Sequence, residues 1–149
     1  MKVQGSALLP ATREKVWDLL NDPERLAKCL PGTERLVPDG PDRYKVAMKF
    51  GLAAFSGKFQ GSVEIAEKKP PVSLKMRVEG RGAPGFMKGE GTISLHEKSG
   101  ATEVTYDGEA QVGGVIASVG QRMIEAASKK IVQQFFDAAA AELKASGGN

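Results

Sequence analysis

The sequence is poor in the residues on which most metal sites and many enzyme sites depend. Its 149 residues include one cysteine, one histidine and one tryptophan. Cys29 cannot form an internal disulfide, and one cysteine with one histidine cannot build a zinc site from these residue types. The opening residues MKVQGSALLP also lack the apolar run of a signal peptide. We therefore expect an intracellular, cytoplasmic protein without a metal site.

Long hydrophobic runs and concentrated charge are missing as well. No apolar stretch approaches the roughly 20 residues that a membrane-spanning helix needs. The formal net charge is only +3, and the basic residues are spread along the chain, which argues against nucleic acid as a partner. With 41% hydrophobic and 26% charged residues, the composition is that of a globular protein. We expect one domain over residues 1–145 and a disordered tail over 146–149.

The middle of the chain alternates apolar and polar residues with the period of two that is typical of half-buried strands. Between these segments lie short turns rich in proline and glycine, which favour an antiparallel meander. A further strand is expected over residues 2–9. The alternating segments are 43–50, 53–66, 72–79, 85–96 and 102–112.

Helical signals flank this region. Thr12 is a candidate N-cap for a helix that ends near Asn21, and Asp22-Pro23-Glu24 is a restart signal for a second short helix to about Lys28. From Val119 to Leu143 apolar residues recur every three or four positions, which predicts one helix of about 40 Å. Such a helix would cover the apolar face of a curved sheet.

The inward positions of the five alternating segments carry no Asp, Glu, Lys, Arg, His or Cys, but they include several glycines. Glycine can serve the bending of a sheet over a helix. Glycine also removes side chains, and a void of about 300 Å³ would be at the low end of ligand pockets. Both interpretations stay open. The glycines are Gly57, Gly61, Gly89, Gly91 and Gly108.

Inward methionine and tyrosine side chains are further candidates for contact with a ligand. Met48, Met76 and Met87 suit an irregular or variable apolar surface, as does Met123 on the helix, although ordinary core filling explains methionines equally well. Tyr44 and Tyr106 bring the inward hydroxyl groups of these strands. These hydroxyls either orient a polar head group or reach the mouth of the cavity.

The sequence context of each candidate catalytic motif argues against a catalytic role. Residues 80–85 read GRGAPG and match G-x-G-x-x-G, but a strand follows where a dinucleotide fingerprint needs a helix. His96 falls on the outward side beside a turn, so it cannot serve acid–base chemistry in the cavity. Cys29 fits a packing residue at a helix end better than a reactive thiol. We therefore predict a protein that is not an enzyme.

The predicted layout is α+β: a curved antiparallel sheet wrapped around a long C-terminal helix, two short helices after the first strand, and an apolar cavity between. This layout resembles the helix-grip fold of the START-like (SRPBCC) superfamily. Within it, several motifs resemble the CoxG family of carbon monoxide dehydrogenase subunits. They are WDLLNDPE at 17–24, CLPG at 29–32, FMKG at 86–89, TY at 105–106, GG at 113–114, GQRMI at 120–124 and FF at 135–136.

The resemblance implies a non-catalytic accessory protein of a molybdenum carbon monoxide dehydrogenase-type enzyme. Such a protein would carry a hydrophobic ligand, a quinone, without any covalently bound cofactor. It would link the enzyme to the membrane through a peripheral contact at its inner face. The alternative is an assembly or recruitment factor with a merely structural cavity. The residues expected to contact the ligand are Tyr44, Met48, Phe55, Phe59, Met76, Met87, Gly89, Tyr106, Met123, Ala127 and Ile131.

Overall fold

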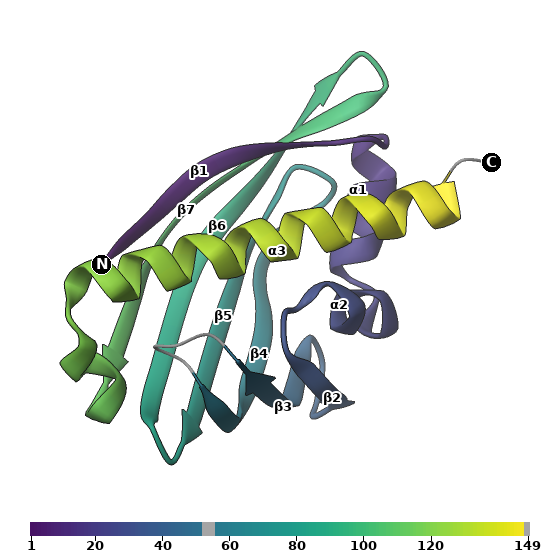
Figure 1. Cartoon of the computed structure of the whole chain (residues 1–149). Helices are drawn as coiled ribbons and strands as arrows, with labels where there is room; N and C mark the ends of the chain where they lie inside the picture. Colours follow the sequence, from purple (N-terminus) through teal and green to yellow (C-terminus); the bar gives the residue numbers. More distant parts are fainter. Residues whose placement is uncertain (52–55, 148–149) are drawn as a thin grey trace.

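One curved antiparallel sheet, a pair of short helices and one long helix make up the computed structural model, which describes residues 1–51 and 56–147 (Figure 1). The expected fold class is confirmed. The elements in chain order are β1 (Lys2–Leu9), α1 (Arg13–Leu20), α2 (Pro23–Cys29), β2 (Thr33–Pro38), β3 (Arg43–Phe50), β4 (Gly57–Lys69), β5 (Ser73–Gly82), β6 (Gly85–Lys98), β7 (Ala101–Gly113), η2 (Gly114–Val119) and α3 (Gln121–Gly147).

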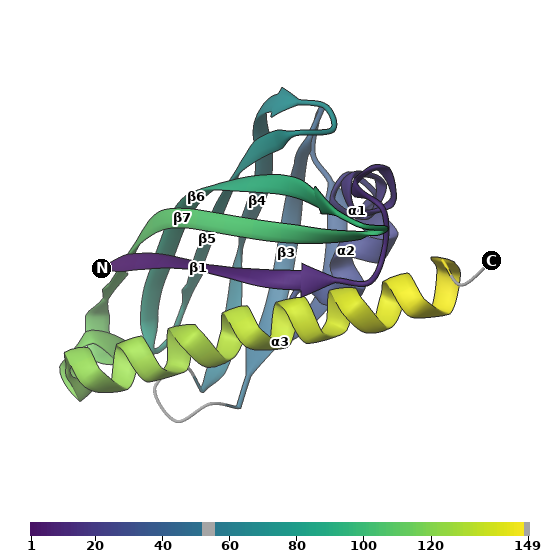
Figure 2. The same ribbon diagram turned by 90° about the horizontal axis from the view of Figure 1, so that it is seen from above.

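The described strands pair in the order β1-β7-β6-β5-β4-β3-β2, and every pair is antiparallel. From β3 to β7 this is the expected meander; β2 extends it beside β3, and β1 pairs with β7 at the opposite edge of the sheet. The sheet curves around α3, which crosses its concave side and runs alongside β1 (Figure 2). The concave face of the sheet and one face of α3 therefore enclose the interior.

The two short helices begin where the sequence predicts. The Thr12 hydroxyl accepts a hydrogen bond from the Lys15 amide, and Asp22 accepts from the amides of Glu24 and Arg25. Pro23 occupies the first helical position of α2, where its missing N–H costs nothing. The caps thus fix both helices between β1 and β2, at one end of the sheet.

Alternation along the strands is also confirmed. On β3 the side chains of Tyr44, Val46, Met48 and Phe50 are buried and those of Arg43, Lys45 and Lys49 are exposed. Val72 is an exception, because it lies in the turn before β5 and is 47% exposed. The other buried apolar side chains of the sheet are Leu9, Phe59, Val63, Ile65, Leu74, Ile93, Leu95 and Val104.

Sequence patterns missed two elements. The edge strand β2 pairs only with β3, and its register shifts between Thr33 and Arg35, so its residues never alternate cleanly. Val119 belongs to the 3₁₀ helix η2, although the sequence pattern placed it in the long helix. At its other end α3 includes Ser146 and Gly147, two residues into the segment expected as a tail.

None of the helices among the described residues is long and apolar enough to cross a membrane.

Packing of α2 against α3 closes one end of the fold. Arg25 Nε lies 3.4 Å from the Glu142 carboxylate, and Leu143 beside it is buried. Cys29, 1% exposed, ends α2 within this contact. Burial, reinforced by the negative charge of Glu142, raises the pKa of the Cys29 thiol to about 11. As the sequence indicated, this cysteine is a packing residue and a poor nucleophile.

Native Cys29 should resist alkylation. The ordinary pKa is 9.0 and the folded value about 11, so the thiolate population near pH 8 falls about 100-fold on folding. We expect iodoacetamide to label the native protein at least that much more slowly than the urea-unfolded protein, followed by mass spectrometry. The protonated thiol also ties stability to pH, with the contribution complete below pH 9 and lost towards pH 11. Equal labelling rates in the two states would contradict this assignment.

Phe59, which the sequence nominated as a ligand contact, packs in the core and does not line the cavity. It is 1% exposed on β4 and packs edge-on to Phe50, with ring centroids 5.9 Å apart. Phe59→Ala should lower the free energy of unfolding by about 3–5 kcal/mol, measured by urea denaturation. Gln60→Ala, next along β4 and exposed, is the matched control and should change stability by less than about 0.5 kcal/mol. A small loss of stability for Phe59→Ala would contradict the assignment of this ring to the packed core.

Candidate functional site

A cavity of about 290 Å³ lies between the concave face of the sheet and α3. This volume is close to the void that the glycine content suggested, and it falls at the small end of ligand pockets. The segment between α2 and β2 closes part of it with Leu30 and Pro31. Its other inward-facing wall residues are Val3, Met48, Phe50, Met76, Val78, Met87, Gly89, Gly91, Ile93, Tyr106, Gly108, Ala110, Val112, Ser128, Ile131, Val132, Phe135 and Phe136.

Charged residues of β6 and β7 also border the cavity, but their side chains point the other way. Lys88, Glu90, Asp107 and Glu109 alternate with the inward glycines, and each is exposed. In a strand, alternate side chains leave opposite faces, so these residues contribute backbone to the cavity and charge to the outer surface. The ion pair between Asp107 and Lys2 of β1 lies on that outer surface.

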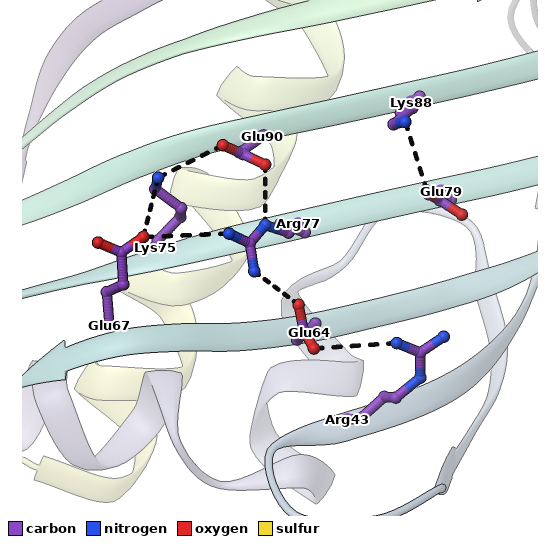
Figure 3. Close-up of polar contacts among 8 residues, drawn as sticks. All are labelled: Arg43, Glu64, Glu67, Lys75, Arg77, Glu79, Lys88 and Glu90. Carbon is purple, nitrogen blue, oxygen red and sulfur yellow. Dashed lines mark hydrogen bonds and ion pairs between the residues drawn. The ribbon is translucent and has the colours of Figure 1, made fainter.

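The outer face of the sheet carries a network of ion pairs, with α3 behind the strands in this view (Figure 3). Arg77 on β5 donates to Glu64 on β4 and to Glu90 on β6, each at 2.8 Å. Lys75 lies 2.9 Å from Glu67. The hydrogen bond from Arg77 lowers the pKa of the Glu90 carboxyl, and the one from Lys75 lowers that of Glu67. These groups stay ionised near neutral pH and are oriented away from the cavity.

The floor of the cavity contains a recess whose only side chain is one methyl group. Gly91 on β6 is the register partner of Gly108 on β7, and Gly89 is the partner of Ala110. We call these four residues the glycine recess. Larger side chains surround it: Ile93 and Tyr106 at one end, Met87 and Val112 at the other, Met76 and Val78 on β5, and Val3 on β1.

The inward glycines have two different structural roles. A Cβ on Gly61 would collide with the backbone of Glu79, and one on Gly108 with that of Glu90, so these two permit a close approach of strands. A Cβ on Gly89 would meet nothing nearer than 3.8 Å. Gly89 therefore leaves open space in the cavity. Gly89 thus fits the interpretation of removed side-chain volume, whereas Gly61 and Gly108 serve close packing of neighbouring strands.

Six of the eleven residues predicted to contact a ligand line the cavity. They come from four strands and from α3, which the fold brings together from distant parts of the chain. They are Met48, Met76, Met87, Gly89, Tyr106 and Ile131. Their role in ligand binding stays a prediction.

Four others lie elsewhere, and Phe55 lies outside the described residues. Tyr44 is 7% exposed and, like Phe59, packs in the interior away from the cavity wall. Ala127 is half-buried against the core without lining the cavity. Met123 is 47% exposed, because it precedes buried Ile124 by one residue and so points about 100° away around the helix.

Tyr106 bears the phenolic hydroxyl of the cavity wall. Its ring stacks on Phe136 of α3, with centroids 5.3 Å apart and an interplanar angle of 25°. The hydroxyl lies against Gly5 on β1, close enough to occupy the space of a Cβ there. Packing from both sides thus holds Tyr106 at one end of the cavity.

Several wall residues escaped sequence reasoning. Leu30 and Pro31 come from a turn whose approach to the sheet depends on the whole fold. Phe135 and Phe136 were visible in the apolar helix pattern but were not chosen. Ser128 is a polar residue within that apolar pattern, so the pattern gave no reason to select it. Its position four residues after Ile124 was the available signal, because such residues share a helix face.

The described residues offer little catalytic chemistry. His96 is exposed as predicted, and its Nε2 lies 3.2 Å from the Thr105 hydroxyl on the outer surface. No group of three or more His, Cys, Asp or Glu residues in the described part of the chain could hold a metal ion. The cavity can therefore enclose an apolar molecule, with hydroxyl groups to orient it.

Comparison with solved structures supports the fold. A conserved protein from Geobacillus kaustophilus shares 38% identity with a TM-score of 0.94, over 98% of this chain and 97% of that one. A START superfamily protein from Mycobacterium smegmatis (11% identity, TM-score 0.76) covers 96% of this chain and 97% of its own. The Streptomyces aromatase/cyclase Zhui (19% identity, TM-score 0.68) covers 97% of this chain and 93% of its own.

A search among curated proteins found no match. The profile of one family of carbon monoxide dehydrogenase subunits, CoxG, matches residues 5–144. That range includes every strand of the described sheet in whole or in part, both short helices, and α3 up to its last turn. The motifs that resembled this family thus lie within a match that spans nearly the entire fold, and the chain belongs to the CoxG family of carbon monoxide dehydrogenase subunits.

Proposed function

We propose that this protein binds a hydrophobic small molecule between α3 and the sheet and carries it without transforming it. One observation carries the proposal: a cavity of about 290 Å³ whose inward side chains, among the described residues, include no carboxylate, amine, guanidinium, imidazole or thiol. Acid–base catalysis needs such a group at the substrate. The site therefore favours binding over chemistry.

The cost of leaving the cavity unfilled points the same way. At about 24 cal/mol per Å³, a void of this volume corresponds to ~7 kcal/mol, an upper bound because the coefficient comes from truncated side chains. A whole domain is stable by only about 5–15 kcal/mol. An apolar guest that fills the space would recover part of this energy, which supports a ligand over an empty core.

Family membership supports the identity of the partners. We propose that the protein is an accessory to a molybdenum carbon monoxide dehydrogenase-type oxidoreductase and that its ligand is a quinone. In this role it would connect the enzyme with the membrane through a peripheral contact. A quinone matches the wall described above, since its ring and prenyl groups are apolar and its carbonyl oxygens accept hydrogen bonds.

Exposed apolar side chains favour a second candidate, an assembly or recruitment factor. Val115 is 70% exposed and Val119 42% exposed on η2, and Met123 follows on the first turn of α3. A protein partner could bury these side chains whether or not the cavity holds a ligand. Recovery of the oxidoreductase in a pull-down by a cavity-blocked variant would support this role.

The binding proposal predicts that a side chain on Gly89 blocks the site. Gly89→Leu should fold, because the first added carbon meets open space. It should reduce the affinity for N-phenyl-1-naphthylamine, a neutral apolar dye, at least tenfold in a fluorescence titration. Thr92→Leu adds a leucine to the exposed face of the same strand and should bind the dye like the wild type.

Protein purified from its native host supplies an independent measurement. Organic extracts analysed by mass spectrometry should contain a quinone or another lipid from the wild type and markedly less from Gly89→Leu. Unchanged dye binding by Gly89→Leu, together with clean extracts from both proteins, would overturn the binding proposal.

A further inference from the structure

Exposed apolar side chains gather at one end of the sheet. Among the described residues seven large apolar side chains are exposed, and four of them lie on η2, on the first turn of α3 and at the start of β6. This is the end at which η2, drawn in green, connects β7 to α3, opposite the turn from β6 to β7 (Figure 1). We call these four side chains the η2 rim: Phe86, Val115, Val119 and Met123.

Backbone contacts hold the parts of the η2 rim together. The Ile116 amide of η2 donates a hydrogen bond of 2.8 Å to the Pro84 carbonyl, in the turn between β5 and β6. Two glycines allow this approach, since a Cβ on Gly114 would lie 2.7 Å from the Cα of Gly85. The Ile116 side chain is buried, whereas the residues on either side of it are exposed. The rim is therefore one surface that the fold holds in place.

The charged residues around the η2 rim are all basic. The described stretches at this end of the sheet contain no Asp or Glu, and Glu79 and Glu125 lie just outside them. These stretches are 46–51, 56–61, 80–89 and 110–124. Their basic side chains are all exposed, and they are Lys49, Lys58, Arg81, Lys88 and Arg122.

Apolar side chains bordered by basic ones fit the surface of a membrane that contains anionic lipids. Segments that lie in the bilayer interface combine apolar groups with lysine and arginine in this way. The long basic side chains keep their charge among the lipid phosphates while their stems contact apolar groups. Arg81 already has this arrangement, because its guanidinium carbon lies 5.7 Å from the centroid of the Phe86 ring. Both the charge and the apolar groups of the rim would thus find partners in one lipid surface.

The η2 rim also adjoins the cavity. Phe86 and Ile124 line a second recess, and this recess shares residues 110–112 of β7 with the wall of the main cavity. A bilayer against the rim would therefore lie beside the cavity, and an apolar molecule could pass between them with little exposure to water. An acidic protein surface would match the charge but would supply no apolar reservoir. This continuity favours lipid over protein as the occupant of the rim.

We propose that the η2 rim docks this protein on membranes that contain anionic phospholipids, with Val115, Val119 and Met123 in the bilayer interface and the basic side chains at the lipid phosphates. This inference rests on the peripheral membrane contact of the proposed function. It names the surface that makes the contact and the lipid charge that the surface recognises.

Co-sedimentation of the purified protein with sucrose-loaded vesicles tests the lipid charge. One set of vesicles is phosphatidylcholine with about a third phosphatidylglycerol, and the other is phosphatidylcholine alone. The wild type should bind the anionic vesicles roughly tenfold or more tightly than the neutral ones. High salt should remove most of this preference, because exposed charges are screened. Equal binding to both kinds of vesicle would overturn the recognition of anionic lipid.

Two substitutions with matched controls test the surface. Arg122→Gln should weaken binding to the anionic vesicles about fivefold, whereas Lys69→Gln, the same change of charge at the opposite end of β4, should alter it less than about twofold. Val115→Ser should weaken binding about tenfold. Its control is Leu8→Ser, which removes a similarly exposed apolar side chain at the far end of β1 and should leave binding unchanged. Thermal unfolding checks that each variant is folded.

The failure of this inference differs from the failure of the proposed function. If the wild type binds the anionic vesicles and all four variants bind them equally well, the η2 rim is not the docking surface, and the membrane contact itself stands. If the wild type binds no vesicles but still binds N-phenyl-1-naphthylamine, the membrane contact falls together with this inference, the rim is left to a protein partner, and binding in the cavity stands.

Discussion

The separation between α3 and the sheet is the constraint on which the rest of this structure depends. The helix is fixed at both ends: Ile124 is buried near η2, and Ala139 and Leu143 are buried where α2 packs against it. Between these ends it crosses the glycine recess, where the only side chain of the sheet is the methyl group of Ala110. A straight helix cannot bend into a local depression without losing hydrogen bonds. The cavity is thus the space left between a rigid rod and a floor with missing side chains.

Segregation of charge between the two faces of the sheet keeps that space apolar. Arg77, Glu64 and Glu90 are bound to each other across three strands on the outer face. A slip of one residue would turn all of them inward, so the hydrophobic interior specifies the register strongly. Close backbone contacts add to this, because at Gly61 and Gly108 the neighbouring strand leaves no room for a side chain. The same alternation therefore produces an inert cavity and a highly charged exterior.

Sequence reasoning predicted the fold and the side of the sheet on which residues lie, because periodicity and caps are local signals. It could not separate cavity wall from packed core. Phe59 and Met48 face the same way, yet only Met48 lines the cavity, since the outcome depends on the path of α3 and on the turn at Leu30. Ser128 was missed for a related reason: a polar residue within an apolar stripe counts against the stripe, and only the fold shows that it lines the cavity.

A small cavity lined mainly by apolar side chains is suited to transient binding. A ring system of about 14 heavy atoms at ~0.5 kcal/mol per atom, between the values for fragments and drugs, would bind with ~7 kcal/mol, or a Kd near 10 μM. At an association rate of about 10⁶ M⁻¹s⁻¹, such a ligand leaves roughly ten times per second. Additional charged contacts would slow release of the ligand, and a titratable group beside the ligand could catalyse a reaction. The inward side chains described here include neither, which agrees with the proposed role of a carrier, because delivery requires release as well as binding.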